Sequence, residues 1–149
     1  MTLAIVHDDT RVLLGLKKRG FGVGRWNGFG GKVGDDETIE EVAKRELFEE
    51  SGLRWMAGRA AGLLRFSFER ESKKIEMHIF RVTHVSGEPM ETEEMKPQWF
   101  DFSDIPFHDM WPDDRFWLPG FLEGKKVNGS FHFGNEQIIL KYELHFSTQ

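Results

Sequence analysis

Three glutamates, Glu46, Glu49 and Glu50, stand close together in a segment that the sequence predicts to be helical. At about 100° per residue, Glu46 and Glu50 fall within about 20° of the centre of the apolar stripe of this helix, and Glu49 lies at the edge of the stripe. The stripe consists of Ile39, Val42, Ala43 and Leu47. Carboxylates that face inwards at this spacing repel one another and lose hydration, which costs free energy unless a positive group lies between them.

A hard divalent cation is the positive group that this arrangement suits. Three oxygen ligands on one helical face stand beside a glycine-rich turn that offers carbonyl groups. The sequence has no cysteine and no histidine pair at ligand spacing, so Mg²⁺ is the expected ion and Mn²⁺ the alternative. The competing interpretation is a solvated acidic helix, because runs of charged residues usually lie on a surface.

The composition predicts a single domain over residues 1–149, with 14 Phe and 5 Trp available for a core. Without cysteine the chain has no disulfide framework and no thiolate nucleophile. A net charge of −5 argues against binding to duplex nucleic acid, although bound cations would let the chain take a polyphosphate ligand. No apolar run is long enough to span a membrane, and the N-terminus lacks a signal-peptide layout. We therefore expect a monomer of the cytoplasm, or of the mitochondrial or nuclear compartments in a eukaryote.

Strands and helices are mixed without a regular β-α-β repeat, which predicts an α+β sandwich around a mixed sheet. The first helix is expected to run from its N-cap, Thr38, to Ser51, and Gly52 ends it. A second helix is expected within residues 111–126, with Pro112 near its first position. Strands are expected at residues 2–8, 11–18, 60–70, 73–85, 96–102, 129–134 and 136–146.

The segment from residue 19 to residue 32, ahead of the first helix, is unusually rich in glycine. Such a composition indicates unusual backbone angles and a close approach of the main chain to another group. The segment is not a P-loop, because Lys32 is followed by Val33 rather than by Ser or Thr. Asn27 either forms an Asn-Gly turn here or presents its donor and acceptor to a ligand.

The glycine segment and the glutamate helix together resemble the signature of the Nudix hydrolases. The matching residues are Gly31, Glu37, Arg45, Glu46, Leu47, Glu49, Glu50, Gly52 and Leu53. The resemblance implies a Nudix fold, an α/β/α sandwich around a mixed sheet. It also implies hydrolysis of a nucleoside diphosphate linked to another group, with Mg²⁺ held by Glu46, Glu49, Glu50 and the Gly30 carbonyl. Arg45 would pair with Glu37 and brace the loop against the helix.

The chain is similar from end to end to the MutT-type branch of this family, in "RVLLGLKKRGFG", "GRWNGFGGKV", "EEMKP" and "MWPDD". This branch sanitises the nucleotide pool and prevents mutagenic incorporation by hydrolysing oxidised purine nucleoside triphosphates such as 8-oxo-dGTP and 2-oxo-dATP. The implied products are the monophosphate and pyrophosphate, with water attacking the β-phosphorus. The resemblance makes Glu94 a further metal ligand, although by its sequence alone it is an ordinary loop glutamate. Glu50 is the expected general base, and Glu46 and Glu94 are its rivals.

A purine needs flat apolar walls and a few polar groups aimed at its edge. Phe66 shares one strand face with Phe68, which by itself is more typical of a core than of a pocket. Thr2 stands at the start of the first strand, where we expect fraying, and Ile75 replaces a methionine that borders the pocket in the animal branch. By resemblance, the base site and its border consist of Thr2, Lys17, Phe21, Asn27, Phe66, Trp111, Asp113 and Asp114.

The neighbouring acids Asp113 and Asp114 have two interpretations. Acids in the first turn of a helix cap free N–H groups and interact well with the helix dipole. Adjacent acids beside Trp111 also raise one another's pKa by burial and repulsion. A carboxylate accepts hydrogen bonds from a guanine-type edge, whereas a protonated carboxyl also donates one, which suits an adenine-type edge. A pair that exchanges a proton would therefore read both oxidised bases, and we expect Asp113 to be the stronger reader.

Two other functions remain open at this point. One is a different Nudix hydrolase, acting on a dinucleoside polyphosphate or on capped RNA, and "WNGFGG" and "MWPDD" argue against it. The other is a non-catalytic Nudix module that senses a nucleotide. The complete set of acids argues against that module, because binding alone does not need them.

Overall fold

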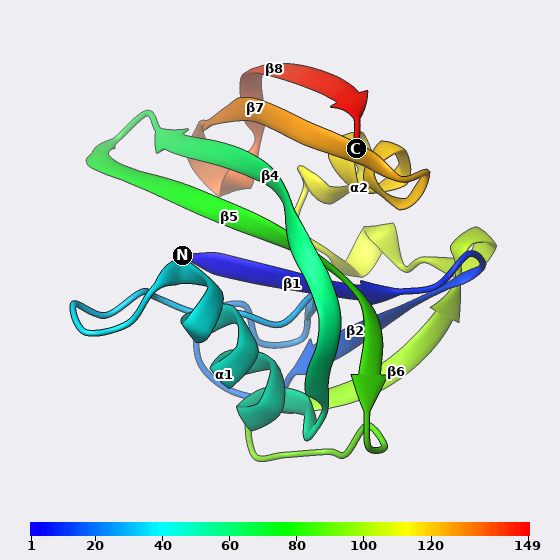
Figure 1. The fold of residues 1–149 in the computed structure, drawn as a ribbon. Coiled ribbons are helices and arrows are strands. Elements are labelled where there is room, and N and C mark those ends of the chain that lie inside the picture. The colour runs from blue at the N-terminus through cyan, green and yellow to red at the C-terminus, as the bar shows by residue number, and fades with distance from the viewer.

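The computed structural model describes residues 1–149, whose strands form one mixed sheet of eight strands (Figure 1). The strands are β1 (Thr2–His7), β2 (Arg11–Lys17), β3 (Trp26–Asn27), β4 (Arg54–Phe68), β5 (Glu71–Ser86), β6 (Met95–Asp101), β7 (Lys125–Phe133) and β8 (Ile139–Thr148). The helices are α1 (Ile39–Ser51) and α2 (Asp114–Leu122), with short 3-10 helices at Phe102–Asp104, Phe107–Asp109 and Asn135–Gln137. Neither α-helix has the length and apolar character needed to cross a membrane.

The strands follow the order β3-β2-β1-β5-β4-β7-β8 across the sheet, and β6 also pairs with β2. The pairs β1 with β5 and β4 with β7 are parallel, and all other pairs are antiparallel. The central position of β1 explains its burial, because a strand with neighbours on both sides and helices on both faces is covered along its whole length, and its four middle residues, Leu3–Val6, are apolar. The mixed sheet confirms the predicted fold class.

The two faces of the sheet carry separate hydrophobic cores, which makes the molecule a three-layer sandwich. Successive side chains of a strand point to opposite faces. Leu3 and Ile5 of β1 accordingly belong to a cluster with Trp117 of α2, and Ala4 belongs to a cluster with Leu47 of α1. Helix α1 packs against β1, β4 and β6, and helix α2 packs against β7 and β8. The two helices therefore cover opposite faces, as the Nudix resemblance implies.

Helix α1 has the boundaries that its sequence predicts. The Thr38 side chain accepts a hydrogen bond from the backbone N–H of Glu41, and the Glu41 side chain accepts one from the backbone N–H of Thr38, which completes the capping box. At the other end Gly52 has φ 79°, the left-handed conformation that ends a helix and that glycine adopts without steric cost. These two ends fix the rotation of the helix, and hence the directions in which its glutamates point.

Several predicted boundaries are wrong. Helix α2 ends at Leu122 instead of continuing to residue 126, because Gly124 turns the chain with φ 94° and β7 begins at Lys125. Strand β4 begins at Arg54, ahead of the predicted residue 60, since it pairs with β5 across several irregular positions that an alternating pattern does not show. Residues 135–137 form a 3-10 turn instead of the start of the last strand.

Candidate functional site

A pocket of about 480 Å³ lies between the glycine segment and the start of β1. Its wall combines the glycine segment, the start of β1, the paired strands β4 and β5, and the residues that lead into α2. All the residues that the sequence assigned to the base site line it, namely Thr2, Lys17, Phe21, Asn27, Phe66, Trp111, Asp113 and Asp114. Gly30 and Glu50 line the same pocket, so the predicted base site and the predicted catalytic glutamate share one cavity.

The glycine loop lies directly against two of the α1 carboxylates. The backbone N–H of Gly30 donates a hydrogen bond to Oε1 of Glu50 over 3.0 Å. A Cβ atom on Gly31 would lie 2.6 Å from Oε1 of Glu46, which is closer than real Cβ contacts come. The lack of a side chain at Gly31 therefore lets the loop approach Glu46, and a Cβ atom on Gly30 would instead meet the Thr2 carbonyl at the start of β1.

Arg45 ties the loop before α1 to the glutamates of the helix. Its guanidinium donates two hydrogen bonds to Glu37, of 2.7 and 2.9 Å, in the two-pronged geometry that favours arginine. The same side chain reaches Glu46 at 3.1 Å and Glu49 at 3.2 Å. The predicted pair between Arg45 and Glu37 is thus present, and it braces the loop.

The orientation of the three helix glutamates follows the prediction from the helical period. Glu50 is buried, Glu46 is largely buried with 18% of its side chain exposed, and Glu49 is 54% exposed. Burial raises the pKa of Glu46, and it raises the pKa of Glu50 to about 7 against the lowering effect of the Gly30 N–H. Neighbouring carboxylates raise these pKa values further, because like charges lie close together. Glu49 raises the pKa of Glu46, and Glu46 raises that of Glu50. A bound cation would favour the charged form of both carboxylates.

Two of the predicted metal ligands have other partners in this arrangement. Glu49 accepts from Arg45, and Glu94 accepts from Arg19 at 2.7 Å and lies 3.7 Å from Lys17. The ion pair with Arg19 lowers the pKa of Glu94. No three acidic or histidine side chains converge on one point. The donor set still fits a hard cation, because its atoms are all oxygens beside the glycine loop, but Glu49 and Glu94 have to exchange basic partners for the ion.

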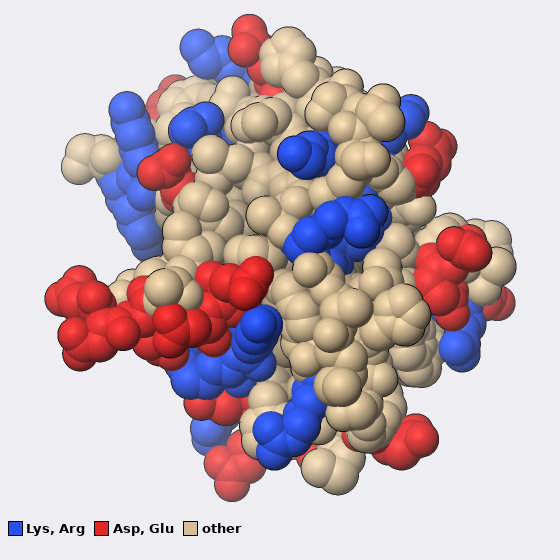
Figure 2. All heavy atoms as spheres, viewed as in Figure 1, with Lys and Arg blue, Asp and Glu red and all other residues tan.

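Acidic side chains also gather on the surface over the loop before α1 and over its first turn, as Figure 2 shows. They include Asp35, Asp36, Glu37, Glu40 and Glu41. On the face shown, this acidic patch lies over the helix that carries the glutamates, and such a field raises the local concentration of cations.

At the other end of the pocket, Asp113 and Asp114 are both buried, with 6% and 4% of their surface exposed. The indole N–H of Trp117 donates to Oδ2 of Asp113 over 3.0 Å, whereas Oδ2 of Asp114 is buried without any hydrogen-bond partner. Burial raises the pKa of Asp113, and burial together with the charge of Asp113 raises the pKa of Asp114 well above its usual value. Unpaired buried polar atoms are rare and costly, so this oxygen is available to a ligand.

The capping interpretation of the two acids does not hold for Asp113. It occupies the N-cap position of α2 but makes no hydrogen bond from its side chain to the helix backbone. Its carboxylate is turned to Trp117 instead. The sequence favoured Asp113 as the stronger reader of the base, and the structure leaves the free acceptor on Asp114.

Aromatic rings and a guanidinium surround Trp111 in the pocket wall. The ring of Phe21 stacks on Trp111 with centroids 5.1 Å apart and an interplanar angle of 27°. The Arg25 guanidinium lies 4.2 Å from the indole centroid. Gly22 has φ 86°, and a Cβ atom there would lie 3.2 Å from Trp111, so the glycine loop can fold over the indole only at a residue without a side chain. Sequence reasoning missed Arg25.

The remaining walls correct two expectations. Thr2 is not frayed: it is 1% exposed, and its backbone N–H donates to the Gly31 carbonyl over 2.8 Å. Asn27 is not in a turn, because it ends strand β3 and pairs with Gly15. Phe66 both lines the pocket and packs in the core, which joins its two proposed roles. The pocket is also lined by Phe68, Ile75, Met77, Phe133 and Gln137, of which Gln137 had no signal in the sequence because only the folded β7–β8 turn brings it there.

The mixed sheet between two helices, with a glutamate helix beside a glycine loop, defines a Nudix domain. The NUDIX domain family matches residues 2–121, and this chain belongs to that family. It is 53% identical over 143 residues to the oxidized purine nucleoside triphosphate hydrolase of Mus musculus, which covers 96% of this chain and 92% of the mouse protein. It is 49% identical over 144 residues to the protein of the same name from Danio rerio, covering 97% of this chain and 92% of that protein.

A solved MutT protein from Bacillus halodurans has the same architecture. The two chains superpose with a TM-score of 0.85 at 28% sequence identity, over 96% of this chain and 95% of that one. The fold predicted from the sequence is thereby confirmed. Nudix hydrolases generally use divalent metal ions and act on small nucleotides, which agrees with the oxygen donors and the pocket described above.

Proposed function

We propose that this chain hydrolyses oxidised purine nucleoside triphosphates to the nucleoside monophosphate and pyrophosphate, and so sanitises the nucleotide pool. One observation carries the proposal. A single pocket joins a buried, unpartnered carboxylate oxygen beside an indole ring at one end to the buried Glu50 and the glycine loop at the other. A nucleotide has the matching polarity, with a flat base at one end and phosphates at the other. The names of the mouse and zebrafish relatives support the same substrate class.

Recognition of the base falls to the paired acids and the rings. The indole of Trp111 offers a flat surface for a purine, and Oδ2 of Asp114 can accept a hydrogen bond from the base edge. The raised pKa of both acids favours retention of a proton on the pair, so the pair can also donate a hydrogen bond. The amide of Asn27 supplies a further donor and acceptor in the same pocket.

We propose Mg²⁺ as the ion, with Glu46, Glu49, Glu50 and the Gly30 carbonyl as its protein ligands and Glu94 as a further one. When bound, such an ion neutralises charge on the phosphates and lowers the pKa of a water molecule. Arg45 holds Glu46 and Glu49 near the loop, where they would meet a bound ion. Lys17 borders the pocket and adds positive charge where phosphates would lie.

Glu50 is the best candidate to accept the proton of the attacking water. Of the three rivals, only Glu50 lines the pocket. Its pKa of about 7 without a metal suits a group that exchanges protons at neutral pH. The proposal includes action as a monomer in the cytoplasm, where free nucleotides are the substrates, with no role for duplex nucleic acid or membranes.

The test is an assay of product formation with Mg²⁺ and a panel of substrates. The panel contains 8-oxo-dGTP, 2-oxo-dATP, their unoxidised parents, a dinucleoside polyphosphate and a capped RNA. We expect kcat/KM for the oxidised triphosphates to exceed that for their parents by about tenfold or more. Equal turnover of oxidised and ordinary purines would defeat the sanitation function, and preference for either of the last two substrates would assign the chain to a different Nudix activity.

A further inference from the structure

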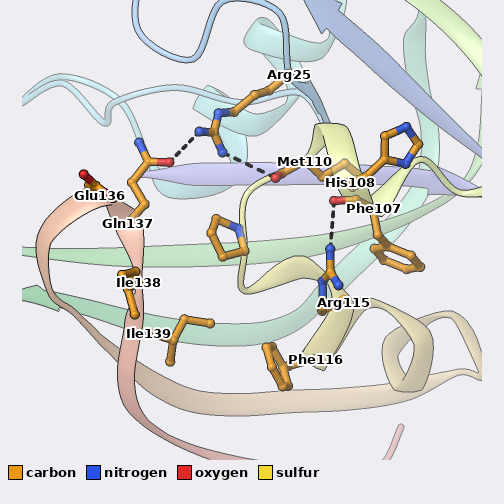
Figure 3. Close-up of a pocket in the computed structure, with 11 residues that line it drawn as sticks. Arg25, Phe107, His108, Met110, Arg115, Phe116, Glu136, Gln137, Ile138 and Ile139 are labelled. Carbon is orange, nitrogen blue, oxygen red and sulfur yellow. Dashed lines mark hydrogen bonds between the residues drawn. The ribbon is translucent and has the colours of Figure 1, made fainter.

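Arg25 is a partly buried cation with no acidic partner within ion-pair distance. Its guanidinium instead lies over the Trp111 indole, 4.2 Å from the ring centroid. It also donates a hydrogen bond of 3.4 Å to the carbonyl of Met110, the residue just before Trp111, and another to the side-chain oxygen of Gln137. Figure 3 shows Arg25 placed between these two oxygens. Three separate segments of the chain thus meet at one guanidinium.

Gln137 is held in an unusual conformation. Both Glu136 and Gln137 have positive φ, 57° and 62°, in the 3-10 turn between β7 and β8. Residues other than glycine rarely adopt positive φ, and the resulting backbone strain persists only where the surrounding structure holds it in place. Of the two residues, only Gln137 bonds to Arg25. Glycine at either position would relieve the strain, but only at position 137 would it remove the amide that holds the guanidinium.

The same residues form the partition between two cavities. Arg25 and Gln137 line the nucleotide pocket, and they also line a second cavity of about 380 Å³ next to it. Figure 3 shows this second cavity, with Phe116, Ile138 and Ile139 on its far side. Loss of Arg25 would remove its contact with the Trp111 indole, and loss of Gln137 would remove a hydrogen bond that holds Arg25.

We propose that Arg25 is a positioning residue for base recognition, which holds the Trp111 indole in the pocket wall, and that Gln137 fixes Arg25 in turn. The proposal rests on the function proposed above, because it takes Trp111 to be the surface on which the base stacks. A cation over an indole is attracted by the ring and fixes its plane. The planar guanidinium can stack and donate two hydrogen bonds at once, which the ammonium of lysine cannot reproduce. Neither Arg25 nor Gln137 takes part in the hydrolytic step.

The first experiment separates an effect through Trp111 from a direct effect on the substrate. We expect Arg25→Ala to raise KM for 8-oxo-dGTP about fivefold to tenfold while kcat changes less than about twofold, and Arg25→Lys to restore only part of the loss. In a Trp111→Leu background, Arg25→Ala should change KM by less than about twofold, because the ring on which it acts is gone. An equal rise in KM in both backgrounds would show that Arg25 contacts the substrate itself, and it would overturn the proposal.

The second experiment uses the strained turn and does not depend on whether Arg25→Ala folds. Gln137→Gly and Glu136→Gly both relieve a positive φ, but only the first removes the bond to Arg25. We expect a rise in KM of about threefold or more in Gln137→Gly and none in Glu136→Gly, and thermal melts should confirm that both variants are folded at the assay temperature. Equal KM values in the two variants would refute the role of Gln137. Absence of 8-oxo-dGTP hydrolysis in the wild type would instead refute the function, which keeps the two failures distinct.

Discussion

The substitution Asp114→Asn gives the sharpest test of how the pocket reads a base. The carboxyl of Asp114 has an unpartnered buried oxygen, and its pKa is raised by burial and by Asp113. An amide has nearly the same shape, but it always presents one donor group and one acceptor. It therefore mimics the protonated carboxyl and cannot mimic the carboxylate.

The expected effect on the two substrates is unequal for this reason. A guanine-type edge donates its hydrogen bonds, so the amide group of the variant would place a donor against a donor. A buried mismatch of this kind costs about 1–3 kcal/mol, which corresponds to about fivefold to 150-fold in kcat/KM. An adenine-type edge needs a donor and an acceptor, and the amide supplies both. We expect 8-oxo-dGTP to lose about tenfold in kcat/KM and 2-oxo-dATP to change by less than about threefold.

The same substitution should change how stability depends on pH. Because the folded-state pKa of the acids is raised, the folded protein keeps a proton that the unfolded chain loses above about pH 4. The free energy of unfolding contributed by the pair is therefore complete below that pH and falls as pH rises towards the raised folded-state pKa. The slope is about 1.4 kcal/mol per pH unit for each retained proton. Asp114→Asn removes one such group, so its melting temperature should fall less steeply with pH than that of the wild type.

The assay measures kcat/KM for both oxidised substrates at pH 7, with thermal melts between pH 4 and pH 8. Asp109→Asn is the matched control, because Asp109 lies a few residues earlier in the same segment and its side chain is 55% exposed. The control should leave both the substrate ratio and the melts unchanged. Equal losses on both substrates in Asp114→Asn would show that the pair does not read the base by exchange of a proton. A lower melting temperature with an unchanged substrate ratio would leave only a structural role.

Three further predictions concern the chemistry and the fold. Glu50→Gln should lower kcat by more than about tenfold, or about 1.4 kcal/mol in barrier. Its circular dichroism spectrum should stay unchanged, since the amide oxygen can still accept a hydrogen bond from Gly30. A smaller loss of kcat would exclude Glu50 as the base or as an essential ligand. In ¹⁸O-water the label should appear in pyrophosphate, as attack at the β-phosphorus requires, and mass spectrometry would reveal label in the monophosphate if attack is at the α-phosphorus. Gln149→Ala should lower the free energy of unfolding, measured in urea, by about 1–3 kcal/mol. The buried Arg81 has no acidic partner, and the variant removes the hydrogen bond that its Nε donates to Gln149. An unchanged free energy of unfolding would mean that water replaces the amide.

The helix that carries the glutamates could be predicted from sequence because its determinants are local. Thr38 and Glu41 are three residues apart, Gly52 ends the helix by its own conformational freedom, and the direction of each glutamate follows from the helical period. The second helix was predicted too long because its end depends on Gly124, whose positive φ is chosen by the path into β7 and not by the neighbouring residues. Strand β4 was predicted too short, because its first residues do not alternate between apolar and polar side chains. Pairing with β5 holds these residues in the sheet, and that pairing cannot be read from their sequence alone.

The two interpretations of Asp113 and Asp114 show where local reasoning about the site ends. Sequence position makes both of them ordinary first-turn acids, and a resemblance makes both of them readers of a base. Their hydrogen bonding differs because the Trp117 indole, in the first turns of α2, reaches Asp113 and leaves Oδ2 of Asp114 unpaired. That difference depends on how α2 packs against the sheet.

The partition behind Trp111 could not be predicted either, because it depends on contacts between segments that are even further apart in the sequence. Arg25 stands in a glycine-rich segment where a basic residue reads as solvated, and Gln137 stands where a strand was expected. Their hydrogen bond joins positions 112 residues apart, and it exists only when the β7–β8 turn accepts positive φ at two residues that are not glycine. The glycine loop and the α1 glutamates therefore lie in one continuous stretch of sequence, whereas the surroundings of Trp111 come from segments that meet only after folding. Substitutions in distant turns should accordingly alter selectivity among bases more readily than the hydrolytic step.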